Sequence, residues 1–263
     1  MRRWFALVAG AVVLTALVGV VARADDFWTK KQWQQWSESD CTKILKDSPW
    51  SHTYTMSKAL VSADLHPDSH GTDPLQPPPV AGSAASGETK EEINYVVQLR
   101  SALPIRQAMV REMAIKQKYD KFNADQKKQF DDRAGQFLTR SYDDVIIVDV
   151  TYDSNIQTFM RALAEYWQSV PETAVPEDAH LILQNGTRIS PVRFVSQKGA
   201  NYEFELIFPR VQNGEPVIGA NDKVLGLEFT HPDLSQVKKD FPTQRVYVEF
   251  KPEKMEMNGK MTF

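Results

Sequence analysis

The stretch YEFELIFPR, residues 202–210, is the clearest indication of the fold class. Its large apolar side chains alternate with Glu203 and Glu205 before Pro209 ends the run. The same alternation recurs in LGLEF, residues 225–229, and in VYVEF, residues 246–250. A period of two is typical of β-strands that bury one face. We therefore expect this part of the chain to consist of half-buried strands.

Turn signals around these strands indicate antiparallel pairing. Asn185-Gly186 lies between LIL (181–183) and TRI (187–189), and both turn residues tolerate a positive φ. Asn258-Gly259 marks a second hairpin near the C-terminus. Short strands separated by turns about every ten residues are typical of two-sheet packing. The sequence therefore predicts a C-terminal antiparallel immunoglobulin-like β-sandwich, mostly within 144–263.

One more strand and a crossover helix are expected at the start of the sandwich. Residues 145–151 are rich in β-branched side chains and are interrupted only by Asp149, which is typical of a strand buried on both faces. Ser154 and Gln157 have the spacing of a capping box. The helix that follows aligns five apolar side chains, Ile156, Phe159, Met160, Leu163 and Trp167. We expect it to cap an open end of the sandwich.

Residues before the sandwich predict a strand and two helices. The strand covers about 94–101, and Pro104 near a helix start favours a helix to about Tyr119. Asn123 can cap the second helix, whose apolar side chains recur at helical spacing as Phe130, Ala134, Phe137 and Leu138. The expected class is therefore α+β, with one α+β domain over 91–263.

Two different segments precede this domain. Residues 62–90 are rich in Pro, Gly and Ser and predict a flexible, disordered linker. Residues 25–61 form a tryptophan-rich segment with a short helix that Ser37 can cap. Trp33, Trp36 and Trp50 could form a ligand-stacking platform, or could hold this segment against the neighbouring domain. The second interpretation is the one we favour.

The N-terminus predicts export. Arg2 and Arg3 precede an uncharged apolar run, and Ala22-Arg23-Ala24 fits a signal-peptidase site, so residues 1–24 are expected to be a cleaved signal peptide rather than a retained membrane anchor. Its removal changes the formal charge from −3 to −6. That balance argues against nucleic acid as a partner. We expect a periplasmic or secreted protein that meets the membrane only through this segment, with Cys41 as a buried, unreactive thiol.

Residues with catalytic or metal-binding chemistry are sparse in the sequence. His66, Asp68 and His70, with Asp64 and Asp73 beside them, are weak candidates for a metal site, but they lie in the expected linker, so no metal or other cofactor is predicted. We interpret Asp149 as a buried, hydrogen-bonded structural carboxylate. The other carboxylates of the β-rich region, among them Glu203, Glu205 and Glu228, are expected on the surface. Arg210 is expected to bind a carboxylate such as Asp222.

Four segments of the chain resemble a family of exported proteins from soil bacteria of the acidobacterial type. They are WSE (36–38) with ILKDSPW (44–50), LPIRQA (103–108), FELIFPR (204–210), and FK (250–251) with Met255 and GK (259–260). This family has no established activity. The resemblance therefore implies export and a shared fold, and it assigns no functional residue.

Together these patterns predict an exported, non-catalytic interaction or structural module of the bacterial envelope, whose partner is an unknown envelope protein or ligand. An extracytoplasmic protein that binds a sugar or a peptide is the first alternative. An unrecognised hydrolase is the second, because catalytic groups can converge from distant positions of a chain.

Overall fold

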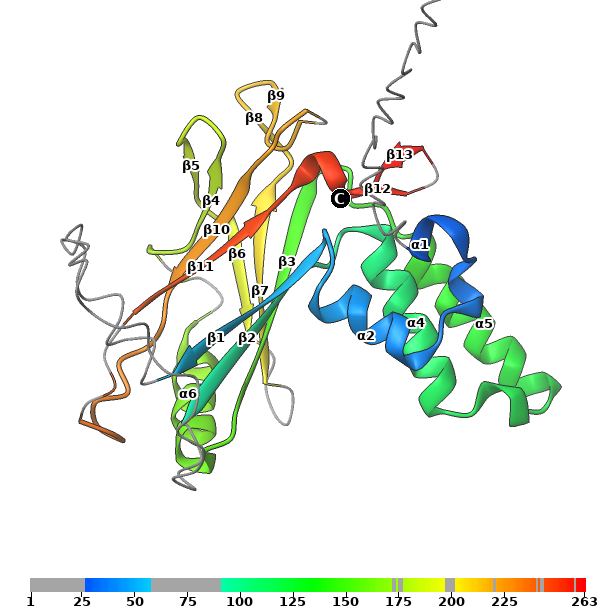
Figure 1. Cartoon of the computed structure of the whole chain (residues 1–263), viewed down its shortest axis with the longest axis horizontal. Coiled ribbons are helices and arrows are strands. Elements are labelled where there is room, and N and C mark those ends of the chain that lie inside the picture. Colours follow the sequence, from blue (N-terminus) through cyan, green and yellow to red (C-terminus); the bar gives the residue numbers. More distant parts are fainter. Residues whose placement is uncertain are drawn as a thin grey trace, which may run out of the picture.

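Most of the helices lie to one side of two antiparallel sheets, while one helix lies on the side of the sheets themselves (Figure 1). The structure is a computed structural model that describes residues 27–57, 91–171, 174, 177–196, 202–219, 221–239, 241, 244–257 and 259–263. The expected signal peptide (1–24), the expected linker (62–90) and the weak metal candidates His66, Asp68 and His70 lie outside these residues. No helix within the described ranges is long and apolar enough to cross a bilayer.

The larger sheet has five antiparallel strands in the order β1-β2-β3-β7-β6. These are β1 (Ser51–Ser57), β2 (Glu92–Leu99), β3 (Val145–Ser154), β7 (Glu203–Pro209) and β6 (Arg193–Ser196). The sequence did not indicate β1 as a strand, yet it pairs with β2 along its whole length. The tryptophan-rich segment is therefore built into the sheet through its last strand.

The smaller sheet has four antiparallel strands in the order β11-β10-β4-β5. Its strands are β11 (Arg245–Phe250), β10 (Leu225–Thr230), β4 (His180–Leu183) and β5 (Arg188–Ile189). The β4–β5 hairpin turns at Asn185-Gly186, where Gly186 has φ +82°, as the sequence predicted. Two short ribbons complete the β-structure: β8 (Val211–Gln212) with β9 (Glu215–Pro216), and β12 (Glu256–Met257) with β13 (Lys260–Met261).

Aromatic side chains from both sheets meet in one core. Phe204 of β7 packs against Phe229 of β10, with ring centroids 5.7 Å apart, and Tyr95 of β2 lies 5.2 Å from the same Phe229. Trp167 of α6 (Gln157–Ser169) stacks on Phe204 at 4.1 Å. Burying each such ring contributes roughly 1.5–3 kcal/mol. The expected α+β class with antiparallel sheets is therefore confirmed.

The remaining helices form three successive layers beside the larger sheet (Figure 1). The first layer is α2 (Glu38–Lys46), which follows α1 (Phe27–Lys30) and η1 (Trp33–Gln35) and lies against β1 and β2. The second is α4 (Leu103–Lys116), which packs on α2. The third is α5 (Ala124–Thr139), which packs on α4 after η2 (Tyr119–Lys121). One further short helix, η3 (Pro252–Lys254), follows β11.

Helix caps follow the sequence at two of the three expected places. Ser37 and Asp40 form a capping box at α2, and Asn123 and Gln126 form one at α5. The capping box expected at Ser154 is wrong, because α6 begins after Ile156 without a side-chain cap. Strand β3 extends to Ser154, whose hydroxyl donates to the carbonyl oxygen of Glu92 instead.

A buried tyrosine–histidine pair lies in the core between the sheets. The hydroxyl of Tyr95 and Nδ1 of His231 are 2.7 Å apart, and His231 is fully buried. Nε2 of His231 has no hydrogen-bond partner among the described residues. Burial lowers the pKa of His231 to about 4, from an ordinary value of 6.5. Protonation of this imidazole therefore opposes folding.

Acid should weaken the wild-type protein more than a His231→Asn variant, since Asn can keep the bond to Tyr95 but takes no charge. The unfolded chain binds more protons than the folded one between pH 6.5 and pH 4, so stability falls as pH falls through that window. Relative to the variant, the free energy of unfolding of the wild type should fall by about 3 kcal/mol between pH 6.5 and pH 4. Urea unfolding at pH 7, 6, 5 and 4 measures this. A difference that stays constant with pH contradicts it.

Candidate functional site

Helices α4 and α5 form an antiparallel pair held together at its two ends. At one end, Nη1 of Arg106 donates to the carbonyl oxygens of Phe137, Leu138 and Arg140 at distances of 2.8–3.1 Å. A cation there satisfies carbonyl groups that a helix C-terminus leaves without partners. At the other end, Tyr119, Phe122 and Phe130 form a ring cluster with centroids 5.2–6.2 Å apart.

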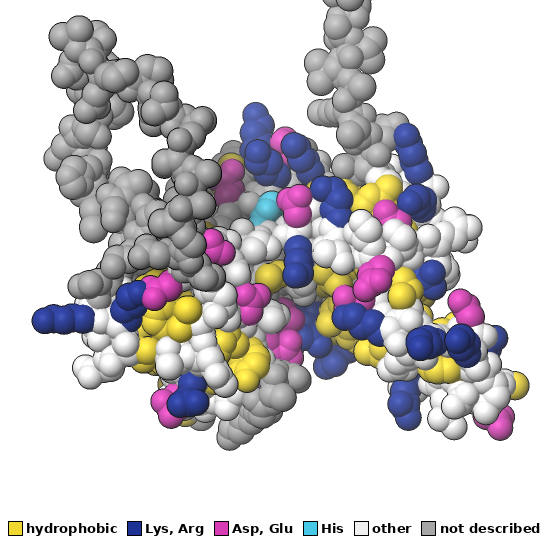
Figure 2. All heavy atoms as spheres, turned by 60° about the horizontal axis from the view of Figure 1, so that its bottom comes forward, with side chains coloured by type: hydrophobic (Ala, Val, Ile, Leu, Met, Phe, Trp, Pro, Cys, Tyr) yellow, Lys and Arg dark blue, Asp and Glu magenta, His cyan; other side chains and the backbone are white. Residues whose placement is uncertain are grey.

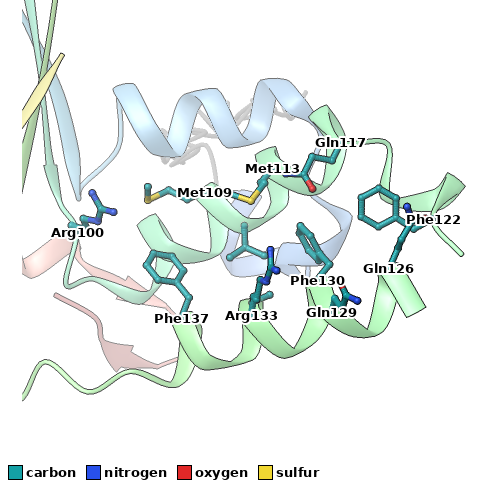
Figure 3. A pocket seen from close by; sticks show the side chains of 12 residues that line it. Arg100, Met109, Met113, Gln117, Phe122, Gln126, Gln129, Phe130, Arg133 and Phe137 are labelled. Atoms are coloured by element: carbon teal, nitrogen blue, oxygen red, sulfur yellow. The ribbon is translucent and has the colours of Figure 1, made fainter. Parts of the chain in front are cut away.

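Between these two ends the helices leave an apolar groove. Its cavity volume is about 490 Å³ (Figure 3). We call it the α4–α5 groove, lined on its apolar walls by Met109, Val110, Met113, Phe122, Phe130, Ala134 and Phe137 and on its polar rim by Arg100, Gln117, Gln126, Gln129 and Arg133. Pockets of 300–1,000 Å³ with mostly apolar walls and a few polar groups are typical of ligand sites.

The apolar face of α5 is only partly covered. None of the described side chains of α5 is buried, and Phe130, Ala134 and Phe137 are half-buried at the groove. Across the groove, Met113 of α4 is 51% exposed. The sequence predicted the apolar stripe of α5 correctly but gave no sign that the stripe faces a groove. The helical spacing of apolar residues shows which face of a helix is apolar, but it does not show what packs against that face.

A charged cluster lies at the sheet end of the groove. Nη1 of Arg100, which follows β2, lies 3.1 Å from Oδ2 of Asp149 on β3 and 3.3 Å from Oε1 of Glu205 on β7. Asp149 and Glu205 are direct cross-strand partners, so both carboxylates project from the same face of the sheet. Arg100 is therefore held by the sheet although it also lines the groove.

Asp149 is the most strongly perturbed carboxylate of the cluster. It is 2% exposed, and its Oδ1 has no hydrogen-bond partner among the described residues. Burial raises the pKa of Asp149 to about 7, against the opposing effect of Arg100. The prediction of a buried, hydrogen-bonded aspartate is confirmed by the bond from Arg100. Perturbed carboxylates occur both at functional sites and in structural ion pairs.

Two of the carboxylates expected on the surface form ion pairs with arginines instead. Glu205 belongs to the Arg100 cluster. The helices cover that end of the sheet face, because Gln98, the cross-strand partner of Asp149, donates a hydrogen bond to the carbonyl oxygen of Leu45 in α2. Glu228 is buried and lies 2.7 Å from Arg188 and 3.6 Å from Arg245. It sits on β10; Arg245 comes from the neighbouring strand β11, and Arg188 comes from β5, which lies beyond β4 in the same sheet. Glu203 remains half-buried.

The expected pairing of Arg210 with Asp222 is wrong. Arg210 donates to the carbonyl oxygens of Tyr142, Val145 and Phe263. The carboxylate of Asp222 accepts from the backbone N–H of Gly219 and closes a turn. Arg210 therefore ties the end of β7 to the segment before β3 and to the C-terminal residues.

Two of the three candidate tryptophans, Trp36 and Trp50, are core side chains. Trp36 and Trp50 are fully buried, and Trp33 is half-buried. Trp50 packs edge-on against Trp28 at 5.6 Å, and its Nε1 donates to the carbonyl oxygen of Thr262. Flat, exposed faces for stacking a sugar are therefore not available at Trp36 and Trp50, and these side chains hold the N-terminal segment to the core.

Cys41 is fully buried, and burial raises the pKa of its thiol to about 11, as expected for an unreactive cysteine. Within the described ranges, no group of three or more His, Cys, Asp or Glu side chains could hold a metal ion.

Replacement of Asp149 by Asn should remove a pH dependence of folding stability. This dependence has the opposite sign to the one that His231 causes. The folded protein binds more protons at Asp149 than the unfolded chain between about pH 4 and pH 7, so wild-type stability falls as pH rises through this window. The stability of Asp149→Asn relative to wild type should therefore rise by about 1.4 kcal/mol per pH unit from pH 5 to pH 7.

Urea unfolding of both proteins at pH 5, 6, 7 and 8 measures that slope. Asp153→Asn is the matched control on the same strand, since Asp153 is exposed and lies outside the Arg100 cluster. Equal slopes in the two variants would contradict the assignment to Asp149.

Comparison with known proteins adds no relative to this description. No protein-family model matches the chain, and no curated protein or solved structure is significantly similar to it.

Proposed function

We propose that the protein is an exported, non-catalytic binding module of the bacterial envelope, and that the α4–α5 groove receives the apolar part of its partner. The observation that carries the proposal is the incomplete burial of α5 opposite Met113. The signal-peptide pattern of residues 1–24 supports export, and so does the resemblance to exported proteins of acidobacterial-type soil bacteria.

The composition of the groove supports binding rather than simple surface exposure. Methionine is flexible and polarizable, so Met109 and Met113 can adapt to the shape of an occupant. Phe130 and Phe137 supply rigid apolar area from the opposite wall. Because the Arg106 bonds and the ring cluster hold both ends of the helix pair, the groove is present before anything binds. A preformed groove avoids much of the ordering cost of binding.

The alternatives rest on different residues. A sugar-binding platform would need exposed tryptophans, and the buried Trp36 and Trp50 disfavour it. A bound peptide remains compatible with the groove. For a hydrolase, the strongest candidate is the Asp149–Glu205 pair, but both carboxylates contact Arg100, which favours an ion cluster that fixes Arg100 in place.

We also propose that the two sheets form an open, immunoglobulin-like sandwich with α6 as its crossover cap. The contacts of Trp167 with Phe204 and Phe229 support this arrangement, since they bring α6 and both sheets into one core. The contact between His52 of β1 and Phe250 of β11, at 5.2 Å, brings one edge of each sheet together.

The protein should bind the neutral fluorescent probe N-phenyl-1-naphthylamine in the groove. Met113→Glu should weaken binding at least about tenfold, because a carboxylate in an apolar wall must be desolvated by the probe. Ala134→Phe should weaken it by filling the cavity. Fluorescence titration of the protein purified after export measures both effects.

Val192→Glu is the matched control, because Val192 is 61% exposed and does not line the groove. Circular dichroism and thermal unfolding show whether each variant is folded. If folded Met113→Glu and Ala134→Phe variants bind the probe as tightly as the control does, the groove is not the binding site.

A further inference from the structure

The helix pair around the groove carries a charge opposite to that of the whole chain. Residues 103–140 contain nine Lys and Arg against five Asp and Glu, a net charge of +4, whereas the chain has −3. Figure 2 shows Lys and Arg side chains standing beside exposed hydrophobic side chains on the helical side, at the right of the view. The groove itself is lined by two arginines, Arg100 and Arg133, and by no carboxylate. Its surroundings therefore favour an anionic occupant.

The two arginines differ in what they already contact. Arg100 is held by Asp149 and Glu205. Arg133 is exposed and forms no ion pair within the part of the chain that the structure describes, although its neighbour Asp132 pairs with Lys128 at 2.8 Å. On α5, the positions three and four residues from Arg133 hold Gln129, Phe130, Gln136 and Phe137. No carboxylate on its own helix face competes for this guanidinium.

The position of Arg133 places a cation among apolar walls. Figure 3 shows Arg133 on α5 between Phe130 and Phe137, with Met109 and Met113 on the opposite wall. An occupant whose anionic group meets Arg133 can therefore lay an apolar chain along either half of the groove. A planar guanidinium forms forked hydrogen bonds with a carboxylate.

We propose that the α4–α5 groove binds a single-chain amphiphile with a terminal carboxylate, of the fatty acid class, and that Arg133 binds its carboxylate. The cavity volume of about 490 Å³ falls in the range of small-molecule sites. This inference rests on the proposed function, since it requires that the groove binds apolar groups. It adds the head group and the residue that selects it.

Displacement of N-phenyl-1-naphthylamine tests the head-group selection. Dodecanoate and dodecylamine have the same chain and opposite charges, and both are used at pH 8 at micromolar concentration. Dodecanoate should displace the probe at a concentration about tenfold lower than dodecylamine does, because a charge-assisted bond to Arg133 is formed only with the carboxylate. Arg133→Gln should reduce this preference to within about twofold, and Arg133→Lys should keep part of it.

Arg161→Gln on α6 is the control for a change in overall charge, since Arg161 is exposed and does not line the groove; it should keep the full preference. Equal displacement by the two amphiphiles, or a full preference in Arg133→Gln, overturns the assignment to Arg133 and leaves the apolar groove standing. If the wild-type protein does not bind the neutral probe at all, both this inference and the proposed function fail.

Discussion

Strand β3 runs through the middle of the larger sheet and has to satisfy two different environments at once. Ile146, Val148 and Val150 are fully buried in the core that the two sheets share. Asp149 projects from the opposite face, where burial would leave a carboxylate without solvent. Arg100, at the end of β2, donates a hydrogen bond to this carboxylate. Strand β3 is therefore buried along its core face, whereas on the opposite face only Asp149 is buried and Val145, Ile147 and Thr151 are half-buried.

The order of layers beside this sheet explains why a groove exists. Helix α2 lies on β1 and β2, α4 packs on α2, and α5 packs on α4 as the outermost layer (Figure 1). An outermost helix can bury its apolar stripe only against the layer beneath it. Arg106 fixes one end of α5 and the aromatic cluster around Tyr119 fixes the other, so the middle of the stripe remains half-exposed. The open groove is a consequence of how α5 is attached.

The sequence predicted local features better than distant ones. Alternation identified β7, β10 and β11, Asn-Gly identified the β4–β5 turn, and cap residues identified the starts of α2 and α5, because each signal is contained in a few neighbouring residues. The neighbours of Asp149 in the cluster are Arg100 and Glu205. Only the register of β2, β3 and β7 brings these distant residues together. The groove was missed for a similar reason, since a helical stripe does not reveal how far it will be covered.

Methionine methyl resonances test most directly whether the groove receives an apolar occupant. Met109 and Met113 line the groove, whereas Met255 is buried in the core and serves as an internal reference. On titration of ¹³C-methyl-methionine protein with N-phenyl-1-naphthylamine, the Met109 and Met113 signals should shift together while the Met255 signal stays in place. Saturable binding with both groove signals unmoved would contradict this expectation.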